Sequence, residues 1–163
     1  MEENIKYKSE WILEKWLDKE SWESGKDPDS ISEIAGNCLL TEGINELFTI
    51  LCSAASGTKF DSTHCYIGVG SDATAATAAQ TGLIANSNKS YMPMDSGFPT
   101  YGTNGMATFK ATWGSDDANY SWNEFSIANG NSDSAKNLNR KVSAQSTKVQ
   151  GQIWSMTFQI TLS

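Results

Sequence analysis

The chain has 163 residues, enough for one domain with a hydrophobic core, and 39% of them are hydrophobic. Its formal net charge of −7 argues against a nucleic-acid duplex as partner, because such binding depends on an excess of positive charge. Charged residues make up only 19%, whereas aromatic residues reach 10% with six Trp, which favours a β-rich fold with many turns.

Residues 1–33 carry an uneven share of the charge, with ten acidic residues and five lysines for a net charge of −5. The remaining residues hold nine acids and seven bases, for a net charge of −2. This difference predicts two parts. The first is an acidic N-terminal arm or extension over residues 1–33, and the second is a β-rich domain over residues 34–163.

The N-terminal run YKSEWILEKW fits either a strand or a helix. A strand would place Tyr7, Trp11 and Leu13 on one face, whereas a helix would align Ile12 and Trp16 at three-to-four spacing. We favour a strand over Trp11–Trp16.

Three tryptophans of this region are also candidates for a partner interface, because Trp is enriched at interface hot spots. They are Trp11, Trp16 and Trp22.

Three cysteines, Cys38, Cys52 and Cys65, form an odd set without paired spacing. We therefore expect free thiols and synthesis in a reducing compartment. The acidic start MEENIKYKSEW lacks the apolar region of a signal peptide. No apolar run approaches the roughly 18 residues that span a bilayer, so we expect no membrane partner.

One helix is predicted over about residues 41–54. Thr41 is a suitable N-cap, and an acidic residue in the first turn, Glu42, suits the helix dipole. Four apolar residues then recur at helical spacing, which predicts a single buried face packed on the rest of the domain. They are Ile44, Leu47, Phe48 and Leu51.

From residue 65 onward the apolar period is that of β-strands. Cys65–Val69 and residues 107–113 alternate, and the C-terminal run has one apolar face made of Trp154, Met156, Phe158, Ile160 and Leu162. In YSWNEFSIAN the alternation changes phase, which predicts a β-bulge near Asn123–Glu124. The expected fold is mainly β: an antiparallel β-sandwich with one packed α-helix and an N-terminal arm or strand.

The stretch YIGVGSDATA has the glycine spacing of a dinucleotide-binding turn. Such a site needs a helix directly after the glycines, an acidic residue about 20 positions further on and a parallel βαβ unit. The following TAATAAQTG has no apolar helical stripe, and the chain has no βαβ pattern. We therefore expect no cofactor and interpret Gly68 and Gly70 as the end of a strand that leads into a loop.

Residues that could support catalysis are few. His64, the one histidine, adjoins Cys65, but neighbours in a strand point to opposite faces and cannot readily pair. Zinc would need about four ligands, and the cysteines and this histidine show no ligand spacing. Glu124, a single acid beside aromatic residues, is expected to be a paired structural group. We therefore expect neither an enzyme nor a zinc site.

Two Asx-rich turns leave a calcium site open as an alternative. Oxygen ligands for a hard cation could come from residues 116, 117 and 119, or from residues 129, 131 and 133. Asx residues in turns also bind their own backbone, which gives the same pattern without a metal.

Six landmarks together resemble a family of small tailed-bacteriophage virion structural proteins from the head and tail morphogenesis region. They are GNCLLTEGINELFTILC, THCYIGVGSDATAATAAQTGL, YMPMDSGFP, ATWGSDDANYSWNEFSIANG, LNRKV and IWSMTFQITLS. The resemblance covers residues 36–163, and EWILEKW matches the family's opening more loosely. Arg140, the one arginine, is expected to form a bidentate ion pair with a carboxylate.

The resemblance implies a virion component made in the bacterial cytoplasm, without catalytic residues. A capsid decoration or cement protein that stabilises the assembled head is favoured, with the major capsid protein as partner and with self-association. A head–tail connector or tail protein is the alternative within the class. A carbohydrate- or receptor-binding β-sandwich module is the alternative from another class.

Overall fold

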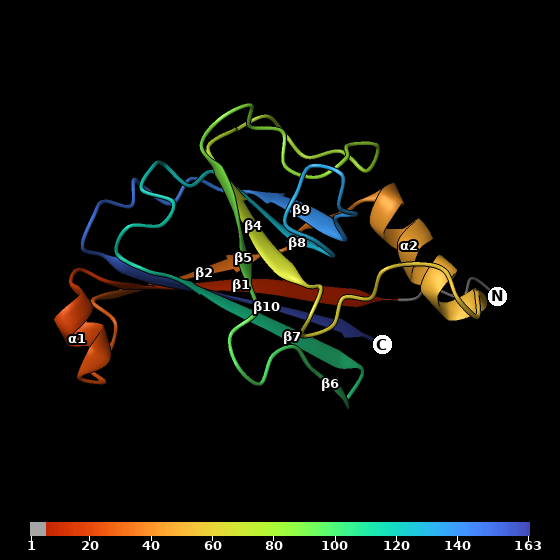
Figure 1. Ribbon diagram of the computed structural model, residues 1–163, viewed down its shortest axis with the longest axis horizontal. Helices are drawn as coiled ribbons and strands as arrows, with labels where there is room; N and C mark the ends of the chain where they lie inside the picture. Colours follow the sequence, from red (N-terminus) through yellow and green to blue (C-terminus); the bar gives the residue numbers. More distant parts are fainter. Residues whose placement is uncertain (1–5) are drawn as a thin grey trace.

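The strands form two antiparallel sheets that pack face to face (Figure 1). The computed structural model describes residues 6–163. The first sheet contains, in spatial order, β2 (Ser30–Ala35), β1 (Tyr7–Trp16), β10 (Ile153–Leu162), β7 (Met106–Trp113) and β6 (Thr100–Thr103). The second contains β3 (Cys38–Leu39), β9 (Asn139–Val142), β8 (Glu124–Ala128), β4 (Tyr66–Gly70) and β5 (Lys89–Pro93). The predicted β-sandwich is confirmed.

The alternating pattern of β10 explains the core between the sheets. Its apolar residues pair across the ladder with apolar residues of both neighbours, so that Phe158 lies opposite Trp11 of β1 and Phe109 of β7. Side chains of one parity therefore share the inner face. Buried residues of the second sheet, such as Ile67 and Phe125, complete the core from the other side.

Tryptophans pack closely at one end of this core. The ring of Trp122 makes edge-on contacts with the rings of Trp113 and Trp154, each at a centroid distance of 4.8 Å. Trp122 precedes β8, which begins at Glu124 with regular pairing to β4. The phase change in YSWNEFSIAN therefore marks the beginning of the strand, and the predicted β-bulge near Asn123–Glu124 is wrong.

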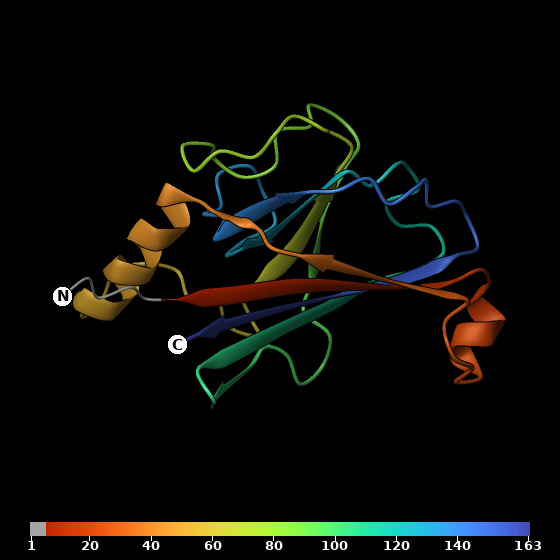
Figure 2. The ribbon, with the colours of Figure 1, turned by 180° about the vertical axis from the view of Figure 1, so that it is seen from behind.

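Residues 7–35 belong to the sandwich and are not a separate arm. β1 pairs with β10 along its whole length, and its other edge pairs with β2 (Figure 2). Buried Trp11 and Leu13 alternate with more exposed neighbours, which is why the segment is a strand, as favoured. The boundary predicted at residue 33 is corrected accordingly; residues 1–5 of the expected arm lie outside the described residues.

Two helices lie at opposite ends of the sandwich (Figures 1 and 2). The short α1 (Lys19–Glu23) begins after Asp18, whose carboxylate accepts a hydrogen bond from the Ser21 amide. α2 (Thr41–Cys52) is the predicted helix, although Leu40 rather than Thr41 is its N-cap. Within residues 6–163, neither helix combines the length and apolar character that a bilayer crossing requires.

Candidate functional site

The glycines of β4 allow buried side chains to approach its backbone closely. A Cβ atom added at Gly70 would collide with the carboxylate of Glu124 on the neighbouring strand β8. A Cβ atom at Gly68 would lie 2.7 Å from the Ser126 hydroxyl and 2.8 Å from the Tyr91 ring. The glycine spacing of YIGVGSDATA thus has a packing explanation in this sheet.

The carboxylate of Glu124 forms a fully buried ion pair with Arg140. Arg140 Nε donates to Glu124 Oε2 at 2.7 Å, and both side chains have no solvent exposure. Arg140 thus forms the expected ion pair with a carboxylate, but the predicted bidentate geometry is wrong, because Nη2 lies 3.5 Å from a second carboxylate, that of Asp72. Hydrogen bonds from Thr74 lower the pKa of Asp72, and the charge of Arg140 lowers it further.

The same pair anchors the long loop of residues 71–88 over the outer face of the second sheet, at the top of Figure 1. Glu124 accepts hydrogen bonds from the backbone amides of Ile84 and Ala85, and Arg140 Nη1 donates to the carbonyl of Thr74 at 2.8 Å. These bonds offset much of the cost of burying the charged pair, although Arg140 Nη2 has no hydrogen-bond partner among the described residues. The Arg140–Glu124 pair therefore holds the loop of residues 71–88 on the second sheet, and we call this pair the structural clasp.

The three candidate interface tryptophans have different environments. Trp11 is completely buried in the core, and Trp16 is 8% exposed. The prediction that these two belong to a partner interface is corrected, because both rings are covered within the chain. Trp11 faces the core, whereas Trp16 lies on the opposite face of β1, where its Nε1 donates to the Lys26 carbonyl at 2.8 Å. Trp22 on α1 is 41% exposed and remains a candidate for a partner interface.

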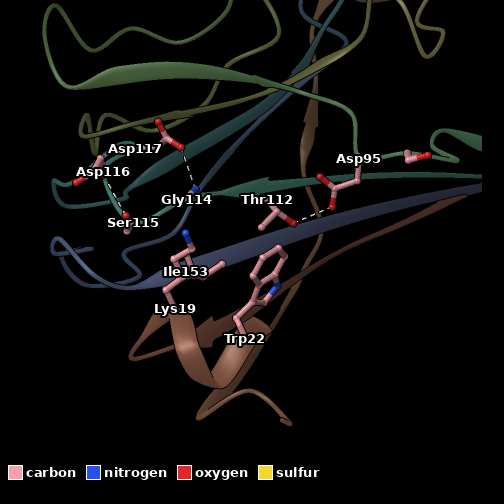
Figure 3. Close-up of a pocket in the computed structure, with 10 residues that line it drawn as sticks. Lys19, Trp22, Asp95, Thr112, Gly114, Ser115, Asp116, Asp117 and Ile153 are labelled. Atoms are coloured by element: carbon pink, nitrogen blue, oxygen red, sulfur yellow. Dashed lines mark hydrogen bonds between the residues drawn. The ribbon is translucent and has the colours of Figure 1, made fainter. Parts of the chain in front are cut away.

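Trp22 lines an open pocket of about 640 Å³ between α1 and the beginning of the 114–119 loop (Figure 3). Lys19 and Trp22 border it from α1, and Asp95 and Asp116 border it elsewhere. Asp95 accepts a hydrogen bond from Thr112 at 2.7 Å. An exposed aromatic ring with carboxylates nearby is suited to a polar ligand with apolar faces, such as a sugar.

An ammonium group fills the first Asx-rich turn. The buried Lys148 Nζ donates to the Gly114 carbonyl at 2.6 Å and to Asn119 Oδ1 at 2.9 Å. Burial lowers the pKa of Lys148, while Asp117 and Asp116 act in the opposite direction. Of the three candidate calcium ligands in this turn, Asn119 thus accepts from a lysine, while Asp117 accepts from the Gly114 amide and Asp116 from Gln150.

The second Asx-rich turn is also occupied by internal contacts. Asn129 Nδ2 donates to the Thr58 carbonyl at 2.8 Å, and Asp133 pairs with Lys89 at 2.8 Å. No group of three potential metal-ligating His, Cys, Asp or Glu side chains occurs among residues 6–163.

His64 and Cys65 lie in different environments. His64 Nδ1 lies 2.8 Å from Asp61 at the surface, whereas the Cys65 thiol is buried in the core, where burial raises its pKa. Hydrogen bonds from His64 lower the pKa of Asp61 despite the opposing effect of desolvation. The structure does not bring these two residues together as a nucleophile and base.

α2 turns its apolar residues outward, contrary to the predicted buried face. Its buried residue is Gly43, where an added Cβ atom would collide with the backbone of Leu138. The exposed fractions of the apolar side chains are instead 36% for Ile44, 45% for Leu47, 59% for Phe48 and 77% for Leu51. The helix thus packs by its glycine and leaves its apolar stripe largely uncovered.

The acidic residues of α2 are turned toward the sandwich, which explains this orientation. Glu42 accepts a hydrogen bond from the Asn137 amide at 2.9 Å, and Glu46 accepts one from Asn129 Nδ2, directly after β8, at 3.1 Å. Glu46 also accepts one from the amide of Thr58 in the loop after α2. The buried Asn137 amide needs an acceptor, so the acids take positions toward the sandwich that the apolar residues were predicted to fill.

An apolar groove of about 280 Å³ lies between α2 and the first sheet. Ile44 and Leu47 line it from the helix, and Met106, Ile160 and Leu162 line it from the sheet. Apolar periodicity identified these helix residues but assigned them to the core. The signal that could have corrected this is Gly43, because a glycine inside a helix often marks a close approach.

Comparison with known proteins returned no matching family model, curated protein or solved structure.

Proposed function

We propose that this protein is a structural component of a tailed-bacteriophage virion, and within that class a decoration or cement protein that binds the assembled capsid. The six sequence landmarks support this proposal. The structural observation that carries it is the apolar stripe of α2, from Ile44 to Leu51, which the rest of the chain leaves largely exposed. Large exposed apolar patches mark protein–protein contacts.

Binding would stabilise the head by mass action. A protein that binds the assembled lattice but not the free subunits adds its binding free energy to the stability of that lattice. The favoured partner in the lattice is the major capsid protein. The structural clasp of Arg140 and Glu124 and the buried tryptophans give such a component a rigid framework. This function uses no catalytic residue.

Mass spectrometry and cryo-electron microscopy of purified particles of the phage that carries the gene test the proposal. A decoration protein is expected on the outer capsid surface in numbers proportional to the major capsid protein. A single ring at the portal vertex or in the tail would favour the connector or tail alternative. Absence of the protein from the particles would refute both.

The pocket beside Trp22 favours a second candidate, a carbohydrate- or receptor-binding module. Aromatic rings stack on the apolar faces of sugars, while carboxylates such as Asp95 accept hydrogen bonds from their hydroxyl groups. A glycan array with the wild-type chain and a Trp22→Ala variant tests it. Binding that is lost in the variant would support this candidate, and no binding to any glycan would count against it.

A further inference from the structure

Lys148, in the segment between β9 and β10, has a side chain without solvent exposure. Every other lysine among residues 6–163 keeps some exposure. The backbone amide of Lys148 donates to the Tyr120 carbonyl at 3.1 Å, and beside it Ser121 and Thr147 form an isolated β-bridge. These contacts hold the segment beside the connection from β7 to β8, so that the Lys148 side chain reaches into the turn of residues 114–119.

The nitrogen atom of this side chain lies between two neutral oxygen atoms. Nζ of Lys148 donates to the Gly114 carbonyl at 2.6 Å and to Asn119 Oδ1 at 2.9 Å. No carboxylate of residues 6–163 forms an ion pair with it. Burial without a directly paired countercharge disfavours the ammonium form, which lowers the pKa of Lys148. Such a lysine is suited to act as a nucleophile, because the neutral amine has a free electron pair.

The side-chain amide of Asn119 presents an electrophilic carbon to this amine. Cγ is bonded to Oδ1 at about 1.23 Å, so it lies no further than about 4.1 Å from Nζ of Lys148. A movement of less than about 1 Å brings the two atoms to the roughly 3–3.5 Å of a near-attack geometry. Asn119 Nδ2 donates to the Ser115 carbonyl at 3.1 Å, which holds the amide in place. Because Asn119 is an exposed residue, a small molecule released from its amide has access to solvent.

A carboxylate that can accept a proton stands in the same turn. Asp117 Oδ2 accepts a hydrogen bond at 2.9 Å from the amide of Gly114, the residue whose carbonyl binds Nζ of Lys148. The negative charges of Asp117 and Asp116 both act on Lys148, that of Asp117 more strongly. Asp116 is engaged by side-chain hydrogen bonds from Gln150 and from the neighbouring serine. Asp117 is therefore the better placed acceptor for a proton of the amine.

We propose that Lys148 and Asn119 join in an intramolecular isopeptide bond, with Asp117 as proton acceptor. The Lys148 ammonium passes a proton to the Asp117 carboxylate, and the neutral amine attacks Cγ of Asn119. The Cγ–Nδ2 bond then breaks, and Nδ2 takes up the proton from Asp117 and leaves as ammonia. The amine nitrogen gives up a second proton as the new bond forms. The products are a neutral amide and one ammonium ion, and no oxidant or further reactant is consumed.

The bond would link the two sheets through their connections. The chain passes from the first sheet to the second between β7 and β8, and it returns from the second to the first between β9 and β10. Asn119 lies in the former connection and Lys148 in the latter. A covalent bond between them restricts the unfolded chain as a disulfide does, and it would form whether or not the protein decorates a capsid.

Intact-mass spectrometry of the denatured full chain tests the proposal. After incubation of the folded protein, the wild-type chain should be lighter than its sequence mass by one ammonia molecule, whereas Asn119→Ala should have its full sequence mass. Gln150→Ala is the matched control, because it removes another exposed side-chain amide that is bound in the same turn. This variant should keep the mass deficit.

Tryptic digestion locates the bond. Trypsin does not cleave after an acylated lysine, so residues 111–136 should be released joined to residues 142–163. A succinimide at Asn104–Gly105 or Asn129–Gly130 would also lose ammonia but would join no peptides.

The wild-type measurement does not depend on the folding of any variant. Full sequence mass of the wild-type chain, or a deficit that persists in Asn119→Ala, would overturn the inference. Asp117→Asn should slow the appearance of the cross-link at least about tenfold, as followed by intact mass at successive times after synthesis. An unchanged rate in this variant would overturn the role of Asp117.

Discussion

At the scale of single residues, the ion pair of Arg140 and Glu124 shows how burial makes a charge dependent on its partner. Replacement of Arg140 by Leu would leave a completely buried carboxylate without its countercharge. We expect Arg140→Leu to lower the free energy of unfolding by about 3–5 kcal/mol. Urea denaturation followed by Trp fluorescence measures this change.

The matched comparison for this variant is the exposed pair Lys19–Glu23, at 3.3 Å on α1. Solvent screens such pairs, so Lys19→Leu should change the free energy of unfolding by no more than about 1 kcal/mol. Equal effects of the two substitutions would contradict the structural role given to the buried pair.

Because the Cys65 thiol is buried, we expect the free energy of unfolding to fall at alkaline pH. Burial raises its pKa above the ordinary value of 9.0, so the unfolded chain releases this proton at lower pH than the folded chain. Its contribution is fully present below about pH 9 and is lost as pH rises further, by up to about 1.4 kcal/mol per pH unit. Unfolding free energies of the wild type and Cys65→Ala at several pH values measure the difference.

Other buried groups also change how the free energy of unfolding depends on pH. Burial raises the pKa of Tyr91 and Tyr120, which adds to the alkaline loss, and lowers the pKa of Lys15 and Lys148, which opposes it as pH rises toward 10.5. These contributions are common to both chains. Parallel pH curves for the wild type and Cys65→Ala would therefore refute the assignment to Cys65.

At the scale of elements, Gly43 determines how α2 is seated. A Cβ atom at this position would meet the backbone of Leu138, which cannot move without disturbing the chain that leads into β9. Gly43→Ala is therefore expected to destabilise the fold by about 1–3 kcal/mol although alanine favours helices. Faster amide hydrogen exchange over residues 41–52 and a lower urea midpoint of the variant would show this destabilisation.

Asn45 on the exposed side of the same helix provides the control. Asn45→Ala improves helix propensity without approaching the sandwich, so we expect a change within about 0.5 kcal/mol. If Gly43→Ala were as stable as Asn45→Ala, the close contact between α2 and the chain near Leu138 would be refuted.

At the scale of the whole molecule, the net charge of −7 makes the like charges of the folded chain repel one another. Salt screens this repulsion, so we expect the free energy of unfolding to rise when ionic strength is raised from about 0.01 M to about 0.1 M, where the Debye length is about 10 Å. Urea denaturation at several salt concentrations measures this effect. Lower stability at the higher ionic strength would contradict a dominant role of self-repulsion.

Local periodicity was sufficient for the fold class, the long helix and the strand character of Trp11–Trp16. An alternating pattern is encoded within a few residues, and burial of one face needs no knowledge of the partner strand. The pairing expected for the sole arginine, Arg140, followed from its chemistry alone. The position of β1 inside the first sheet did not, because strand order depends on contacts between distant segments.

The direction in which an apolar face points was decided only by the tertiary structure. The spacing of Ile44, Leu47, Phe48 and Leu51 specifies a stripe on α2 but not whether the sandwich covers it. That outcome depends on the close approach of Gly43 to the chain near Leu138 and on the hydrogen bonds that Glu42 and Glu46 accept from Asn137 and Asn129. Likewise, only the tertiary structure explains the glycines of YIGVGSDATA. The carboxylate of Glu124 packs against Gly70, although Glu124 lies 54 positions further along the chain. The pairing of β4 with β8 brings the two residues together.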